Sequence, residues 1–295
     1  MPVSDERLRT EQLGKQYGDT WAVEDVTLEL GEGIHGLLGP NGAGKSTLLR
    51  TLTTLTQPTT GTAYWNGMDL TTTPDAVRSV LGYLPQSFGA YPELTVVEFL
   101  EYVATLRGLD DETASARIEA QLELTNLGDV RDERIGTFSG GMRRRVGIAQ
   151  ALVNDPDLLI VDEPTVGLDP EERVRFRNVL SSAADDRVVI LSTHIVPDVE
   201  ATANTVALLN NGELVTHTDP ETLAERVAGD VYEAVVPRAE LDTLRAQHQV
   251  CRTVQRSDGV EARLLAGERP TETADRVAPT LEDAYLACID GREGL

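Results

Sequence analysis

A glycine-rich loop is the feature that most constrains this chain. Residues 39–47 read GPNGAGKST and fit the pattern G-x-x-x-x-G-K-[ST]. An apolar run at 34–38 precedes this phosphate loop and predicts a buried strand. The helix expected after it, over 46–55, places on one face Leu48, Leu49, Leu52 and Leu55. In such a unit the backbone N–H groups converge on phosphate oxygens, so the loop predicts an α/β fold that binds a nucleotide.

The chemistry of two side chains in the loop indicates their roles. Lys45 supplies a positive charge for the β- and γ-phosphates, and the Ser46 hydroxyl is suited to ligate Mg²⁺. Lys45 is one of only two lysines in the chain, which disfavours the alternative of a simple glycine-rich turn. We expect the nucleotide contacts to come from Gly39, Pro40, Asn41, Gly42, Ala43, Gly44, Lys45, Ser46 and Thr47.

A second apolar strand, expected over 158–161, ends in two acids, Asp162 and Glu163. Parallel strands present such residues at their carboxyl edge, where α/β proteins bind ligands. Asp162 would hold Mg²⁺ through water, and Glu163 would polarise the water that attacks the γ-phosphate. Acids after a strand are common, but together with the phosphate loop they predict a nucleoside triphosphatase.

The pattern of apolar residues predicts two domains. Residues 1–229 alternate strand-like runs with amphipathic helices, as in an α/β core, and include a further central strand at 188–191. A charged, helix-periodic stretch at 95–137 predicts a helical subdomain over about 87–150. Residues 230–295 predict a small α+β domain with a strand at 231–236, a helix at 239–247, a hairpin at 250–265 and a final helix at 281–289.

The chain is strongly acidic, with 49 Asp and Glu against 26 Lys and Arg and a net charge of −23. A surface so negative repels the phosphates of nucleic acids, so we expect no nucleic-acid partner. Acid excess with almost no lysine is typical of proteins from a salt-rich cytoplasm, where the Debye length is about 3 Å at 1 M salt. We therefore hypothesise a halophilic source; an acidic protein from a genome rich in G and C is the alternative.

Other features of the sequence bear on the cellular environment in which the chain would fold. No apolar run approaches the roughly 18 residues of a membrane span, and the opening MPVSDERLRTEQ lacks the apolar core of a signal peptide. Cys251 and Cys288 are too few for a disulfide framework, so we expect both to be reduced.

A third motif, FSGGM, stands ahead of the strand that carries the two acids. We call its members Ser139, Gly140 and Gly141 the cap segment. They open a predicted amphipathic helix whose N-terminus is an anion site, with one apolar face formed by Val146, Ala149, Leu152 and Val153. One chain does not need two separate γ-phosphate sites for one ATP, but two chains arranged head to tail would close each cap segment over the other's phosphate loop. The simpler alternative is a helix capped by Ser139.

With this motif the sequence resembles the ATP-binding subunits of ABC transporters over residues 8–228. The resemblance implies that Tyr17 stacks on adenine, although simple packing is an alternative, and that Gln86 reaches Mg²⁺ and the attacking water. It also implies that Asp169 lies in a loop crossing the dimer interface and that His194 contacts the γ-phosphate. The metal site would then comprise Ser46, Asp162 and Gln86, and the catalytic set Glu163, His194 and Gln86.

Two departures from the usual family pattern point to one subgroup of the family. Phe138 and Met142 stand where the family usually has leucine and glutamine, and Met142 lacks the polar contacts of a glutamine. FSGGM followed by three arginines resembles the variant of drug and ABC-2 exporters, as does the ending PTLEDAYL at 279–286. A capped amphipathic helix would give a similar ending.

The resemblance implies an ATPase, with ATP and Mg²⁺, that powers export through a separate membrane permease subunit present in two copies. The permease would dock near Gln86 and residues 95–106, placing this chain as a head-to-tail homodimer on the cytoplasmic face of the cell membrane. The alternatives are an importer ATPase, a soluble ABC protein acting on another partner and a regulatory module without turnover. The transported substrate is not encoded in these residues.

Overall fold

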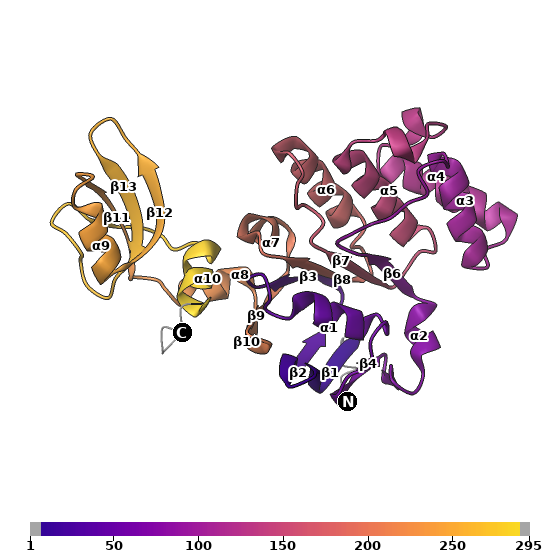
Figure 1. Ribbon diagram of the computed structural model, residues 1–295, viewed down its shortest axis with the longest axis horizontal. Coiled ribbons are helices and arrows are strands. Elements are labelled where there is room, and N and C mark those ends of the chain that lie inside the picture. The colour runs from indigo at the N-terminus through magenta and orange to yellow at the C-terminus, as the bar shows by residue number, and fades with distance from the viewer. Residues whose placement is uncertain (1–6, 290–295) are drawn as a thin grey trace. The chain divides into compact units, whose positions relative to one another are not determined.

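The computed structural model describes residues 7–289. The chain divides between His217 and Thr218 into two compact units (Figure 1). The first unit has the α/β pattern of strands and helices and contains the phosphate loop, and the second is a smaller α+β unit. The predicted α/β core with inserted helices, followed by a small α+β part, is therefore confirmed.

A six-stranded sheet forms the centre of the first unit, in the order β10-β9-β3-β8-β7-β6. The pairs β9–β3, β3–β8, β8–β7 and β7–β6 are parallel. Strands buried on both faces favour continuous apolar runs, which explains why the central strands were predictable from the sequence. The strands are β3 (Gly33–Leu38), β6 (Leu81–Leu84), β7 (Leu158–Asp162), β8 (Val188–Thr193), β9 (Thr205–Asn210) and β10 (Glu213–Thr218).

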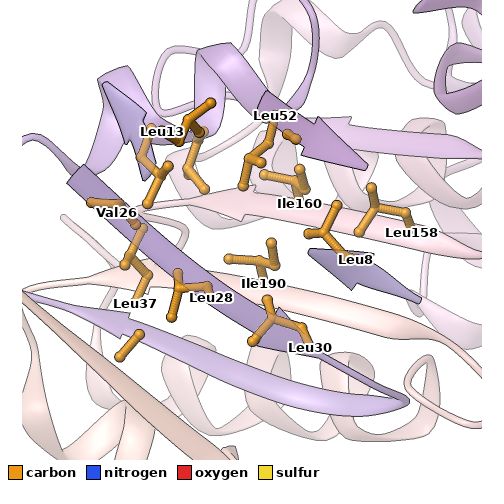
Figure 2. Close-up of a cluster of buried hydrophobic side chains, with 14 of the residues drawn as sticks. Leu8, Leu13, Val26, Leu28, Leu30, Leu37, Leu52, Leu158, Ile160 and Ile190 are labelled. Atoms are coloured by element: carbon orange, nitrogen blue, oxygen red, sulfur yellow. The ribbon is translucent and has the colours of Figure 1, made fainter. Parts of the chain in front are cut away.

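A second sheet of four antiparallel strands, in the order β2-β1-β4-β5, packs against the first with helix α1 (Lys45–Leu52). Leu8, Val26 and Leu28 from this sheet meet Ile160 and Ile190 from the central sheet in one buried cluster (Figure 2). The cluster fixes α1, and with it the phosphate loop, against the end of β3. The strands are β1 (Leu8–Tyr17), β2 (Thr20–Leu30), β4 (Thr60–Trp65) and β5 (Met68–Asp69).

Helix α1 is shorter than predicted, and one predicted core residue is wrong. Leu48, Leu49 and Leu52 are buried as expected, but Leu55 lies beyond the helix and its side chain is 66% exposed. The reason is local: Thr54 adopts a left-handed backbone conformation with φ of 58°, which turns the chain out of the helix before Leu55.

Three helices form the predicted subdomain and lie together in Figure 1. Thr95 begins the first with a reciprocal capping box to Glu98, and Val96, Phe99 and Leu100 pack in a shared apolar cluster. The helices are α3 (Val96–Leu106), α4 (Asp111–Leu124) and α5 (Gly140–Leu152). The first unit also contains the helices α2 (Pro74–Arg78), α6 (Pro170–Ser182) and α7 (Val196–Thr202).

Helix α5 is buried on two sides rather than on the one face expected. Val146, Ala149 and Val153 pack in the cluster of the helical subdomain. Leu152 instead joins Ile148 in the cluster beneath the central sheet. The placement of Leu152 on a single face with the other three was therefore wrong, because α5 bridges the subdomain and the sheet.

The second unit contains the predicted strand, hairpin and helices around a sheet in the order β12-β13-β11-β14. Its elements are α8 (Pro220–Glu225), β11 (Val231–Val236), α9 (Leu241–Gln247), β12 (Gln249–Gln255), β13 (Val260–Leu265), β14 (Asp275–Arg276) and α10 (Leu281–Ile289). The unit begins before α8 because α8 packs against α10. The boundary between compact units therefore falls earlier than residue 229, whereas the functional division at that point stays a prediction.

The PTLEDAYL segment has a structural role in the second unit. Asp283 accepts hydrogen bonds from the Thr280 backbone N–H and hydroxyl, both at 2.8 Å, at the start of α10. Its carboxylate also accepts hydrogen bonds from Nε and Nη2 of Arg263, at 2.9 and 2.7 Å. Such a bidentate, charge-assisted pair is strong and directional, so it fixes α10 on β13.

Both cysteines are free thiols, as expected. Burial, followed by the effect of Asp283, raises the pKa of the Cys251 thiol to about 12, and burial also raises that of Cys288. Since the thiolate is the reactive form, the raised pKa of both thiols disfavours that form near neutral pH. Across residues 7–289, every helix is too short or too polar to cross a membrane.

Candidate active site

The phosphate loop leaves β3 and enters α1, as the sequence pattern requires. Gly44 has φ of 102°, and a Cβ there would lie 2.2 Å from the carbonyl oxygen of Ala22. A Cβ at Gly39 would lie 2.3 Å from the carbonyl oxygen of Leu209. Side chains are therefore excluded at both ends of the loop, which brings its backbone close to neighbouring strands.

Lys45 is buried within the loop that contains it. Its Nζ donates to the carbonyl oxygens of Gly39 at 2.7 Å and Pro40 at 3.2 Å. The same atom lies 3.3 Å from Oε1 of Glu163, and both side chains are 6% exposed. A buried charge needs a partner, so the pair holds the ammonium and carboxylate at the floor of the site.

Glu163 is held directly beyond the end of β7. Its φ of 47° is unusual for a residue with a side chain and costs about 1–3 kcal/mol. Its N–H donates to the carbonyl oxygen of Ser192 at 2.9 Å, and its Oε2 lies 3.0 Å from Nδ1 of His194. His194 follows β8, and β7 and β8 are parallel neighbours. The sheet therefore brings together two predicted catalytic residues that are far apart in the sequence.

Asp162, the last residue of β7, is 3% exposed. Its Oδ1 is buried and, within residues 7–289, has no hydrogen-bond partner. A carboxylate oxygen in this condition fits a hard cation such as Mg²⁺, which prefers oxygen ligands and keeps several waters. The residues present therefore fit the metal.

One pocket gathers half of the predicted site residues; we call it the loop pocket. Among the described residues, it is lined by Ala22, Asn41, Gly42, Ala43, Gly44, Lys45, Ser46, Thr47, Gln86 and Glu163. Gln86 lines the pocket together with the phosphate loop, whereas its contact with Mg²⁺ and the attacking water stays a prediction. Asp162 and His194 do not line the pocket. Asp162 directly precedes Glu163 in the chain, and His194 is hydrogen bonded to it.

Tyr17 lies at the end of β1 and is 49% exposed. The Nζ of Lys15 is 5.3 Å from the centre of its ring. The loop pocket is lined by other residues, and Tyr17 is not among them. An exposed ring is free to stack on a base, so the adenine contact stays a prediction.

The cap segment opens α5, with Ser139 as its N-cap. The Ser139 Oγ accepts from the Met142 N–H at 3.2 Å. A Cβ at Gly140 would meet no described atom within 4 Å, whereas one at Gly141 would lie 2.9 Å from the Glu172 carboxylate. In the part of the chain that the structure describes, the cap segment contributes no residue to the loop pocket.

The flanking residues of the cap segment are apolar contacts. Phe138 is buried in the core of the helical subdomain, and Met142 packs against the same cluster. Asp169 is the N-cap of α6 and accepts from the Glu172 N–H at 2.8 Å. It thus orders the loop that was predicted to cross a dimer interface.

Two residues near the site were not anticipated from the sequence. Asp198 on α7 is buried, and its Oδ2 accepts from the Thr165 hydroxyl at 2.5 Å. This contact ties the segment after Glu163 to the helix after His194. Arg144 on α5 bonds four backbone carbonyls around the site. Neither role was predictable from the sequence, because Asp198 and Arg144 both act through contacts with residues distant in the chain.

The comparisons with known proteins agree with this geometry. A family model described as ABC transporter matches residues 23–166. Nod factor export ATP-binding protein I of Cupriavidus pinatubonensis is 38% identical over 241 residues, which cover 81% of this chain and 74% of that protein. This chain belongs to the ABC transporter family. Daunorubicin resistance ATP-binding protein DrrA2 of Streptomyces coeruleorubidus is 35% identical over 288 residues, covering 96% of this chain and 89% of that protein.

Solved structures of ABC ATPases share the fold. An ATP-binding subunit of an ABC transporter matches with a TM-score of 0.67 and 29% identity over 74% of this chain and 92% of that one. A bacterial ABC transporter cassette solved as a dimer matches with a TM-score of 0.66 and 25% identity over 72% and 98%. The chain is thus an ABC ATPase, a P-loop enzyme whose ATP hydrolysis is coupled to transport.

Proposed function

We propose that this ABC ATPase powers export through a separate membrane subunit, as two copies that close on ATP and open after hydrolysis. One observation carries the proposal: the phosphate loop and the cap segment are both built for anions, yet the cap segment contributes nothing to the loop pocket in the described chain. A head-to-tail pair would let each cap segment meet the γ-phosphate held by its partner. Only ATP spans that interface, so losing the γ-phosphate weakens it.

The cap segment suits an anion delivered by a second chain. Helix α5 runs from Gly140 to Leu152, long enough to carry a positive dipole end at its start. Gly140 has open space where a side chain would be, so a ligand or a partner backbone can approach closely. Asp169 orders the neighbouring loop, which we place at the same interface.

Within each site the chain's own residues would divide the work. Lys45 binds the β- and γ-phosphates, and Ser46, Asp162 and Gln86 hold Mg²⁺, directly or through water. When bound, the ion neutralises charge that builds up on the phosphates. Glu163 accepts a proton from the attacking water, while His194, hydrogen bonded to Glu163, contacts the γ-phosphate. Tyr17 stacks on the adenine.

We place the membrane subunit, in two copies, on the helical subdomain near Gln86. Three apolar side chains are exposed there: Tyr91 at 55%, Tyr102 at 43% and Leu106 at 69%. The rings of Tyr91 and Tyr102 meet edge to face with centres 5.7 Å apart. Such a cluster supports an apolar contact with the partner, and docking would hold the chain at the cytoplasmic face of the membrane. Co-purification of an integral membrane protein from solubilised membranes tests this placement.

The names of the relatives favour export over import. Those described above are an export protein and a drug-resistance protein, and each is similar over most of this chain. The importer and soluble alternatives have no comparable support. Substrate recognition would lie in the membrane subunit.

Replacing Gly140 with aspartate tests the head-to-tail arrangement. We expect G140D to fold as well as the wild type, because the new side chain has space and an acid at a helix start is favourable by about 0.3–1 kcal/mol. The same charge would face the partner's γ-phosphate, so dimerisation driven by Mg·ATP should be lost. Sedimentation with a non-hydrolysable ATP analogue measures the association, and thermal unfolding measures the fold.

The matched control is G128D, in the helical subdomain. A side chain at Gly128 also meets no described atom within 4 Å, and the position lies in the separate short turn Gly128–Val130 rather than at the start of α5. We expect G128D to dimerise like the wild type. If G140D dimerised equally well, the cap segment would not face ATP bound to a second chain.

We also propose that the protein is adapted to high salt. The support is the net charge of −23 with only two lysines, since screening by salt weakens repulsion between carboxylates. We expect the melting temperature to rise between dilute buffer and molar KCl. Equal stability in both would refute the adaptation.

A further inference from the structure

Arg144 makes an unusual set of contacts from the middle of α5. Its Nε donates to the carbonyl oxygen of Pro164 at 2.8 Å, and its Nη2 to that of Glu163 at 2.8 Å. Its Nη1 donates to the carbonyl oxygens of Pro85 at 3.1 Å and Gln86 at 3.0 Å. One guanidinium therefore satisfies four backbone acceptors with three nitrogens, and all four acceptors belong to the segments that carry Gln86 and Glu163.

These two segments leave the central sheet side by side. Pro85 and Gln86 follow β6, and Glu163 and Pro164 follow β7. The strands are parallel neighbours, with Leu84 opposite Val161. Leu84 directly precedes Pro85, and Val161 precedes Glu163 by two residues. Beyond this last pair, the two segments are joined by the hydrogen bonds of the Arg144 guanidinium instead of by hydrogen bonds of the sheet.

Glu163 depends on this bridge more than an ordinary residue would. Its left-handed backbone, with φ of 47°, persists only where the surroundings hold it. On one side its N–H donates to the Ser192 carbonyl oxygen at 2.9 Å. On the other its own carbonyl oxygen accepts from Arg144. Removing the second contact would free the peptide that aims the carboxylate at the loop pocket.

The neighbouring arginines make different contacts. Arg143 donates to the carbonyl oxygen of Phe138 at the start of its own helix. Arg145 donates to that of Asn126 at 3.0 Å, and its Nε lies 3.5 Å from Oε2 of Glu172 on α6. Of the three consecutive arginines, Arg144 is the one that joins the two segments at the site.

We propose that Arg144 is a positioning residue for ATP hydrolysis, holding the backbones of Gln86 and Glu163 in the register that turns both side chains into the loop pocket. This inference rests on the roles proposed above for those two residues. Arg144 acts through main-chain carbonyls and lies outside the lining of the loop pocket. It should therefore govern the rate of hydrolysis and leave ATP affinity nearly unchanged.

The guanidinium is required by shape as well as by charge. Its N–H groups lie in one plane and point in fixed directions, which matches four carbonyls arranged around it. A lysine ammonium keeps the charge but offers three donors from a single atom and cannot reach both segments in the same way. Arg144→Lys is therefore the sharpest variant, because it removes the bridge with little change in charge.

The test compares Arg144→Lys with the matched control Arg145→Lys, which alters an arginine of the same helix that also bonds backbone carbonyls. For Arg144→Lys we expect kcat to fall by about tenfold or more while KM for ATP stays within about threefold, the pattern of a lost transition-state contact. Arg145→Lys should keep kcat within about twofold. Unchanged kcat in Arg144→Lys, or an equal loss in both variants, would overturn the inference.

A double-mutant cycle separates positioning from simple loss of stability. If Arg144 acts through Gln86, Arg144→Lys should lower kcat clearly less in a Gln86→Ala background than in the wild type. Additive effects, or a loss of kcat that disappears when the rate is normalised to folded protein, would refute positioning. The roles on which this rests are tested separately by Glu163→Gln, since an active Glu163→Gln enzyme would reject the base assignment whatever Arg144→Lys does.

Discussion

Replacing Glu163 with glutamine should lower kcat by about 10²–10⁴, the typical contribution of a general base. The amide has nearly the same shape as the carboxylate but cannot accept a proton from water. Its oxygen and nitrogen can still face Lys45 and His194, which lie 3.3 Å and 3.0 Å from the carboxylate. ATP binding should therefore survive, and closed dimers should accumulate with Mg·ATP. Phosphate release, equilibrium ATP binding and sedimentation measure the three effects.

The control for this variant is Glu171→Gln. Glu171 lies in the first turn of α6, pairs with Arg175, and its side chain is 76% exposed. Changing it alters the charge by the same amount on the surface, so hydrolysis should stay near the wild-type rate. A Glu163→Gln protein that hydrolyses ATP at that rate as a monomer would refute both the catalytic role and the dimer.

Replacing Lys45 with alanine should weaken ATP binding by at least about 30-fold, since truncating one member of a buried charge pair costs about 2–5 kcal/mol. The ammonium is 6% exposed and fixed by the carbonyl oxygens of Gly39 and Pro40. No other lysine or arginine lines the loop pocket in the described chain, so none replaces it. Equilibrium titration with a fluorescent ATP analogue measures the loss.

Arg50→Ala serves as the matched control for Lys45→Ala. Arg50 is an exposed cation in the last turn of the same helix, α1. Its removal changes the net charge equally, and ATP affinity should stay within about twofold because exposed charges are screened. If Lys45→Ala bound ATP as tightly as Arg50→Ala, the phosphate loop would not be the site of the phosphates.

The sequence predicted the parts of the site that depend on local chemistry. The phosphate loop follows from glycines and a lysine at fixed spacing between a strand and a helix. The strands ending at Asp162 and before His194 follow from continuous apolar runs. That β7 and β8 are neighbours, which places His194 3.0 Å from Glu163, does not follow from the residues of either strand.

What the sequence did not predict depends on contacts distant in the chain or on unusual backbone. Arg144 donates hydrogen bonds to backbone carbonyls of segments that precede and follow it in the chain. Every residue has a backbone carbonyl, so the residue types do not indicate which ones Arg144 contacts. The early end of α1 depends on a left-handed conformation at Thr54, which a β-branched residue rarely adopts. The start of the second unit before residue 229 depends on packing of α8 against α10.

Mixing two inactive variants tests the head-to-tail sandwich most directly. In a mixed dimer of K45A and G140D, one site carries both defects, and the other combines an intact phosphate loop with an intact cap segment. Each variant alone lacks an intact site, whereas each mixed dimer has one of the two sites of the wild type, so ATPase activity should return on mixing, at up to about half the wild-type rate per mixed dimer. A mixture no more active than the sum of its separate components would contradict the account.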